Sequence, residues 1–161
     1  MIDFNYDSFA GFLGASESGN NYNPGFNGIA YGRYQFTPST IARVANELNI
    51  TVPSISDFIS NPTMQDTFYK QYVNDILNYI ESQNLTQFIG KSITDTKGNT
   101  AIINIYGLVA GAWLGGLGGL VTTLLSLKNP SDLFGTHVSD YIVKFSNYKI
   151  DTGNFFLQSA F

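Results

Sequence analysis

Residues 101–127 read AIINIYGLVAGAWLGGLGGLVTTLLSL, and the interpretation of the whole fold depends on this stretch. It contains no charged residue and is long enough to span a bilayer. It also contains the cluster Gly115-Gly116-Leu117-Gly118-Gly119, and each glycine inside a continuous helix costs about 1 kcal/mol relative to alanine. The cluster therefore favours a turn. We expect two buried core helices that meet there rather than a stable membrane span.

The segments on either side of this core have apolar residues at helical spacing, as amphipathic helices do. The expected helix starts are Asp3, Thr37, Asn61 and Thr136. Proline, which is favoured at the first helical position, follows two of these cap residues, at Pro38 and Pro62. A short helix is expected at Leu85–Ile89, and a turn at Gly98-Asn99.

Residues 16–34 differ from the rest because they are rich in Gly, Asn and Tyr and show little apolar periodicity. This composition is typical of loops and short paired strands. We therefore predict one mainly α-helical domain over residues 1–161, with a small irregular or β-like region near residues 18–36. Residues 149–161 have no clear period, and we expect this aromatic tail to pack on the domain rather than dock on a carrier.

Composition excludes several function classes. The chain has 161 residues, enough for one domain with a single core. Its net charge of −4 gives no basic surface for nucleic acid. Without cysteine, disulfides and thiolate chemistry are excluded, and the single histidine, His137, excludes a His-rich metal site. We expect His137 to be a surface or helix-capping residue, and we expect no metal or cofactor.

The first residues, MIDFNYDSF, lack the basic region of a Sec signal peptide and carry Asp3 and Asp7. The expectation is that the protein does not use the Sec route.

Glutamate occurs only three times, and the three positions differ in their surroundings. Glu47 and Glu81 fall within helical patterns, where a solvated surface charge is expected. Glu17 stands where a helical run ends and the Gly/Asn/Tyr loop begins. Apolar surroundings favour the protonated form of a carboxylic acid, which is the form that a general acid needs. Aromatic side chains can stack on the apolar faces of sugar rings, and amide side chains can form hydrogen bonds with sugar hydroxyls. Glu17 is therefore the candidate general acid for cleavage of a sugar chain.

The pair Glu17-Ser18, followed by Gly32-Arg33-Tyr34-Gln35, resembles the Glu-Ser and Gly-x-x-Gln motifs of soluble lytic transglycosylases. These enzymes belong to the lysozyme-like superfamily. Further segments look like those of phage-encoded and secretion-associated members, namely Asn61-Pro62-x-x-Gln65-Asp66, residues 111–116 and residues 135–141. The resemblance covers most of residues 3–148 in the right order and implies a lysozyme-like fold.

The resemblance also implies roles for individual residues. Glu17 matches the catalytic acid/base, and Ser18 matches the adjacent serine that orients the acid or the substrate. Gln35 matches the glutamine that contacts the glycan, and Gly32 the glycine that lets the backbone approach it. Tyr34 is counted with these substrate-binding residues.

A third motif of the family, Ala-Tyr-Asn, is matched only loosely. Trp113 aligns with its aromatic residue, but Leu114 stands where Asn is expected, so a hydrogen-bonding amide is lost. Tyr106 is a candidate to supply a hydroxyl near Glu17 instead. For both Tyr106 and Trp113, substrate binding and core packing remain open alternatives.

The sequence contains no Asp or Glu between Glu17 and Glu47. Glycosidases that use water or a covalent intermediate normally place a second carboxylate across the bond. Candidates elsewhere, at Asp66, Asp95 and Asp132, have helix-start or surface explanations. A lone acid fits the scheme that the resemblance implies, in which Glu17 cleaves the bond between MurNAc and GlcNAc and leaves a 1,6-anhydro sugar.

Three other functions are kept as alternatives. One is a muramidase that cleaves the same bond with water, and another is a catalytically silent lysozyme-like module of a phage tail or injection device. The third is a membrane-active protein that uses residues 101–127 as a span. In the leading hypothesis the partner is the glycan strand of peptidoglycan. A virion, an injection machine or a holin lesion would then deliver the protein to the wall.

Overall fold

The computed structural model describes residues 2–23, 25, 26, 28–126, 128–132 and 134–148, so the tail at 149–161 lies outside the described residues. The chain is mainly helical, as predicted. It divides into two compact units, which we call the N-terminal unit (Tyr6–Asn74) and the C-terminal unit (Met1–Asn5 with Asp75–Phe161). The lysozyme-like arrangement and the one-domain organisation stay predictions.

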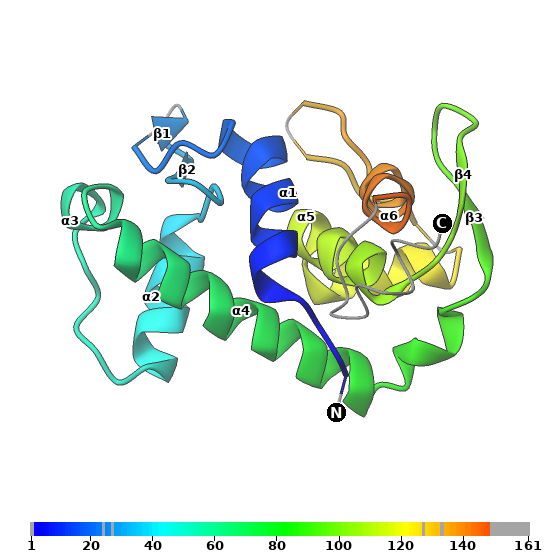
Figure 1. The fold of residues 1–161 in the computed structure, drawn as a ribbon, viewed down its shortest axis with the longest axis horizontal. Helices are drawn as coiled ribbons and strands as arrows, with labels where there is room; N and C mark the ends of the chain where they lie inside the picture. The colour runs from blue at the N-terminus through cyan, green and yellow to red at the C-terminus, as the bar shows by residue number, and fades with distance from the viewer. Residues whose placement is uncertain (1, 24, 27, 127, 133, 149–161) are drawn as a thin grey trace, which may run out of the picture. The chain divides into compact units, whose positions relative to one another are not determined.

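The N-terminal unit contains three complete helices and a small two-stranded sheet (Figure 1). The paired strands confirm the predicted β-like region, because Gly25 pairs with Tyr31 and Phe26 with Ala30 in antiparallel register. The elements are α1 (Tyr6–Ser18), β1 (Gly25–Phe26), β2 (Ala30–Tyr31), α2 (Pro38–Glu47), α3 (Ile55–Ile59) and the first part of α4 (Pro62–Ser82).

Two helix starts in this unit are those that the Pro signals predict. The Thr37 hydroxyl accepts from the Thr40 amide at 3.3 Å, and the Asn61 side chain accepts from the Met64 amide at 3.0 Å. Each cap satisfies a backbone donor that the first helical turn leaves free. The first expected helix differs, because α1 begins at Tyr6 rather than directly after a cap at Asp3.

The core of the N-terminal unit is aromatic. Tyr34 stacks on Tyr69 with ring centroids 4.6 Å apart, and Phe36 meets Phe58 edge-to-face at 5.8 Å. Offset and edge-on contacts of this kind are favourable geometries for aromatic rings. The turn at residues 32–36 is therefore anchored in the core rather than loosely attached to it.

The described part of the C-terminal unit contains the end of α4, a 3₁₀ turn, a hairpin and two helices. Its elements are η1 (Leu85–Phe88), β3 (Ser92–Thr94), β4 (Thr100–Ile102), α5 (Ile105–Leu124) and α6 (Val138–Ser146). Helix α6 packs on α5 and contacts both strands of the hairpin (Figure 1). Its N-cap is His137, which confirms the capping alternative for this histidine and corrects the expected cap at Thr136.

Helix α5 occupies the place of the two apolar core helices expected from the sequence, and it changes direction within the glycine cluster where they were expected to meet. Gly116 has φ 73° and ψ 175°, a conformation that is essentially restricted to glycine. By length and composition α5 is apolar enough to cross a membrane, but half of its apolar window is buried within the protein. Neither half has the ~20 continuous helical residues of a span, which favours the core-helix interpretation.

Glycines in the first half of α5 allow α6 to approach closely. A Cβ atom on Gly107 would lie 2.7 Å from the Ile142 carbonyl oxygen, and one on Gly111 would lie 2.8 Å from Ile142 Cγ1. Both distances are too short for a real side chain. The glycines at i and i+4 that could mark a membrane-helix contact thus serve the packing of α5 against α6 here.

Candidate functional site

Glu17 lies in the last turn of α1 and is half-buried. Residues four apart share one face of a helix, so Glu17 follows Phe9 and Leu13 along the same stripe. Phe9 and Leu13 are fully buried. The carboxyl group thus continues the apolar face of α1 at the point where the helix ends, a partly desolvated position that suits a general acid.

The end of α1 is held in place by the residues that follow Glu17. Gly19 and Asn20 both have positive φ values, of 67° and 60°, which stops the helix. Their amides donate to the free carbonyl oxygens of Ala15 at 3.2 Å and Gly14 at 3.0 Å. The helix end that carries Glu17 is therefore capped and well defined.

Ser18 connects this helix end to the Gly-x-x-Gln segment. Its hydroxyl donates to the Arg33 carbonyl oxygen at 2.7 Å and accepts from the Asn21 amide at 3.1 Å. Asn20 adds a second connection, because its side-chain oxygen accepts from Arg33 Nε at 3.0 Å. Within the N-terminal unit, the two motifs identified in the sequence are thus joined by direct hydrogen bonds.

Gln35 closes a tight turn on Gly32. Its backbone amide and its Nε2 group both donate to the Gly32 carbonyl oxygen, at 3.2 and 3.0 Å. Gln35 has φ 54°, a left-handed conformation that non-glycine residues rarely adopt. Within the described part of the chain its Oε1 atom accepts no hydrogen bond. This half-buried side chain therefore keeps an acceptor for a ligand hydroxyl or amide.

Gln65 is a residue whose role the sequence analysis missed. It is fully buried, and its Oε1 accepts from the Arg33 amide at 2.8 Å while its Nε2 donates to the Tyr22 and Phe58 carbonyl oxygens at 2.9 and 3.0 Å. It also fixes the identity of Gly32, where φ is 81° and a Cβ atom would collide with the Gln65 side chain. Its position four residues before the buried Tyr69 was the available signal, since a polar residue on an apolar stripe needs internal partners.

Tyr34 is 1% exposed, which leaves its ring no free surface for stacking on a sugar. Its hydroxyl donates to Asp66 at 2.7 Å, and Asp66 also accepts from Tyr22 at 3.0 Å. Arg33 completes the group with its Nη1 atom 3.4 Å from Asp66. Burial, followed by the hydrogen bond to Asp66, raises the pKa of Tyr34 above its ordinary value, so it remains a neutral donor. We assign Tyr34 a supporting role, rather than the direct substrate contact expected from the sequence.

Tyr106 and Trp113 belong to the C-terminal unit, on α5. Tyr106 is 4% exposed, its ring centroid lies 4.7 Å from that of Phe4, and its hydroxyl accepts from the Asn5 amide at 3.1 Å. These contacts are those of a core residue. Trp113 and Leu114 are half-buried, so each keeps some exposed surface.

The three other carboxylates considered as catalytic partners each have structural contacts. Asp66 is bound by Tyr22, Tyr34 and Arg33, as described above. Asp95 accepts from the Lys97 and Asn99 amides at 2.8 Å each, which stabilises the hairpin turn. Asp132 accepts hydrogen bonds from the Phe134 and Thr136 amides, at 2.8 and 2.9 Å. Each therefore has a role that needs no catalysis.

Among the described residues, no three His, Asp or Glu side chains lie close enough together to hold a metal ion. Comparison with known proteins finds no matching family model, no similar curated protein and no similar solved structure.

Proposed function

We propose that this protein is a peptidoglycan lytic transglycosylase in which Glu17 is the single acid/base. The observation that supports the proposal is the hydrogen-bonded connection of Ser18, next to Glu17, to the Arg33 carbonyl oxygen in the turn of Gly32 and Gln35. A half-buried acid on a capped helix end is thereby held beside a turn with an unused amide oxygen. General acid catalysis on a glycan needs these two functions, proton transfer and substrate positioning.

In the proposed reaction, Glu17 donates its proton to the glycosidic oxygen between MurNAc and GlcNAc. The bond from this oxygen to C1 of MurNAc breaks, and GlcNAc leaves with a free 4-hydroxyl. The Glu17 carboxylate then takes the proton of the C6 hydroxyl of the same MurNAc. The C6 oxygen bonds to C1, which gives a 1,6-anhydro ring and restores the acid. Water is not consumed, and every proton that Glu17 donates is recovered.

The structural contacts of Asp66, Asp95 and Asp132 favour this scheme over hydrolysis. A retaining or inverting glycosidase needs a second carboxylate that is available as nucleophile or base. A carboxylate that accepts two or more hydrogen bonds from its own chain is less available for that purpose.

Mass spectrometry of the fragments released from purified sacculi tests the proposal. Wild-type protein is expected to release anhydro-muropeptides, which are one water molecule lighter than the hydrolytic products. Hydrated products would identify a muramidase, and no release at all would identify a silent structural module. Glu17→Gln, which preserves size but cannot donate the proton, should reduce release by about 10²–10⁴-fold.

Glu47→Gln is the matched control for that experiment. Glu47 lies on the surface of α2 and pairs with Arg43 at 2.7 Å. Exposed pairs of this kind contribute little to stability, so this variant should keep wild-type release. Equal loss in both variants would remove Glu17 from the proposed mechanism.

A further inference from the structure

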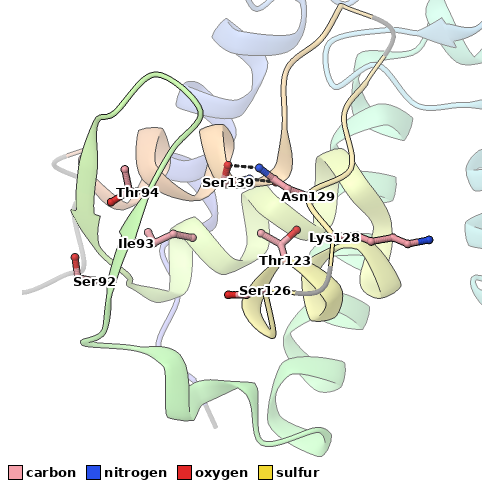
Figure 2. A pocket seen from close by; sticks show the side chains of 8 residues that line it. All are labelled: Ser92, Ile93, Thr94, Thr123, Ser126, Lys128, Asn129 and Ser139. Carbon is pink, nitrogen blue, oxygen red and sulfur yellow. Dashed lines mark hydrogen bonds between the residues drawn. The ribbon is translucent and has the colours of Figure 1, made fainter.

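A cavity of about 430 Å³ lies in the C-terminal unit, between β3, the end of α5 and the start of α6 (Figure 2). This volume is within the range of pockets that hold small ligands. Five hydroxyl-bearing residues line it: Ser92, Thr94, Thr123, Ser126 and Ser139. It shares no residue with the Glu17 site and has no role in the reaction proposed above.

One wall of the cavity is the outer edge of β3. Along an antiparallel pair of strands, residue pairs that exchange backbone hydrogen bonds alternate with pairs that do not. The Ile103 amide donates to the Lys91 carbonyl oxygen, and the Asp95 amide donates to that of Asn99, at 2.9 and 2.8 Å. With Ile93 opposite Ala101, this alternation turns the N–H and C=O groups of Ser92 and Thr94 away from β4. The outer edge of β3 therefore offers backbone N–H and C=O groups that can form hydrogen bonds with an amide group of a ligand.

The opposite wall carries two buried hydroxyls that are only partly satisfied. Ser139 is 4% exposed, and its Oγ accepts from Asn129 Nδ2 at 2.7 Å (dashed in Figure 2). Its own O–H finds no acceptor among the residues that the structure describes. The Thr123 hydroxyl donates to the Gly119 carbonyl oxygen at 2.8 Å and keeps its lone pairs. A ligand that supplies the missing hydrogen-bond partner of either hydroxyl gains binding free energy, because a buried donor or acceptor without a partner is costly.

No charged side chain is directed into the cavity among those that line it. The Lys128 side chain runs away from the other labelled side chains, whereas Ile93 points toward Thr123 (Figure 2). The site thus combines hydroxyls, an amide-like strand edge and one apolar side chain. This chemistry matches an uncharged ring that carries hydroxyls, an acetamido group and an apolar face.

We propose that this cavity is a second glycan-binding site, which holds an uncharged N-acetylated sugar. The choice of this sugar rests on the proposed function, because GlcNAc is the uncharged sugar of the expected substrate. Such a site would keep the protein attached to the wall between cleavage events. Binding there requires no chemistry by Glu17.

Titration of the full chain with N,N′-diacetylchitobiose, followed by methyl NMR and calorimetry, tests the inference. Saturable shifts of the Ile93 methyl signals are expected, in the wild type and equally in Glu17→Gln. Thr123→Val, which removes the hydroxyl at nearly constant volume, should weaken binding about 3- to 10-fold. Ser139→Ala should weaken it similarly by removing the donor.

Thr122→Val is the matched control, because Thr122 also donates to the Gly119 carbonyl oxygen, at 3.2 Å, but does not line the cavity. Its affinity should equal that of the wild type. Absence of Ile93 shifts, or equal affinities of both threonine variants, overturns the inference. If the wild type still releases anhydro products, neither of these results affects the proposal for Glu17. Conversely, saturable Ile93 shifts in a protein that releases no anhydro products would reject only the catalytic proposal.

Discussion

The Ser18 hydroxyl donates to the Arg33 carbonyl oxygen at 2.7 Å, and this contact helps to join the end of α1 to the turn of Gly32 and Gln35. The Ser18 hydroxyl oxygen also accepts a hydrogen bond from the Asn21 amide at 3.1 Å. Because Glu17 precedes Ser18, the position of the candidate acid relative to the turn depends on this side chain. Ser18 is therefore a positioning residue in the proposed reaction.

Ser18→Ala should remove the hydrogen bonds to Arg33 and Asn21, together with the longer one to the Gly14 carbonyl oxygen at 3.3 Å, and should loosen the loop at residues 19–21. We expect a modest loss of stability, of about 1–2 kcal/mol, and a larger proportional loss of sacculus digestion. Thermal unfolding and turbidity assays measure the two effects. Ser56→Ala, on the exposed surface of α3, is the control and should change neither. Full activity in Ser18→Ala would show that the connection is dispensable.

Gln35 offers a test of substrate contact, because its Oε1 atom has no partner within the described residues. Gln35→Ala should raise KM for glycan strands while the unfolding free energy changes by no more than about 1.5 kcal/mol, the value of one hydrogen bond. Gln35→Asn is the companion variant, since Asn tolerates the positive φ at this position but is too short to reach as far. A large stability loss with unchanged KM would instead make Gln35 a structural amide.

Gln65 provides partners for three separate backbone groups in the interior. Gln65→Leu keeps the approximate side-chain volume but removes the hydrogen bonds that Gln65 makes to the Arg33 amide and to the Tyr22 and Phe58 carbonyl oxygens. We expect a loss of about 2–4 kcal/mol in unfolding free energy, measured by chemical denaturation. Gln71→Leu, on the same helix but half-buried, is the comparison and should cost less. An equal cost would mean that the buried amide has no special role.

Local signals in the sequence predicted the two helix starts that are followed by proline, because a cap acts within one turn, but the starts expected at Asp3 and Thr136 were wrong: α1 begins at Tyr6, and the cap of α6 is His137. Thr37 and Asn61 are the two correct caps, since each accepts from an amide three residues later. The change of direction at Gly116 was predictable for the same reason. Glu17 and Gln35 were found through their spacing and through the family resemblance, rather than from periodicity.

Features that depend on distant partners were missed. Tyr34 was expected to contact substrate, because nothing in the loop sequence indicates that it stacks on Tyr69. Helix α3 and the β3–β4 hairpin were not predicted, since each of these elements is only three to five residues long, too short for an apolar period to show in the sequence. The hairpin is fixed by long-range bonds, such as that from Thr96 to Asp140.

Asp140 gives the hairpin a pH dependence. Its carboxylate accepts from the Thr96 hydroxyl at 2.7 Å, the Thr96 amide at 3.0 Å and the His137 amide at 2.8 Å. Partial burial opposes the charge, but these hydrogen bonds outweigh it and hold the pKa of Asp140 below its ordinary value. A carboxyl group whose pKa is lower in the folded than in the unfolded state stabilises the fold. Its contribution is complete above the pKa of the unfolded state, about 3.9, and is lost as the pH falls through the lower pKa of the folded state.

We therefore expect the Thr96 amide signal to shift with pH only below about pH 4, as Asp140 takes up its proton. Asp140→Asn should be less stable than the wild type at pH 7, with a smaller difference at pH 2. Denaturation curves at both pH values measure this change. A stability difference that is independent of pH would contradict the assigned role of the carboxylate.

Leu108 tests whether α5 is a core helix or a membrane span. Leu108 is fully buried in the first half of α5, before the break at Gly116. Leu108→Ala should cost roughly 2–5 kcal/mol in unfolding free energy, because the deleted atoms leave a cavity. Leu125→Ala makes the same chemical change at a site that is 54% exposed, and it should cost far less. Leu108→Lys should prevent soluble folding, since it buries an unpaired charge. In a bilayer span the wild-type chain would instead sediment with membranes and need detergent for extraction, so a wild-type protein that stays monomeric without detergent excludes the span.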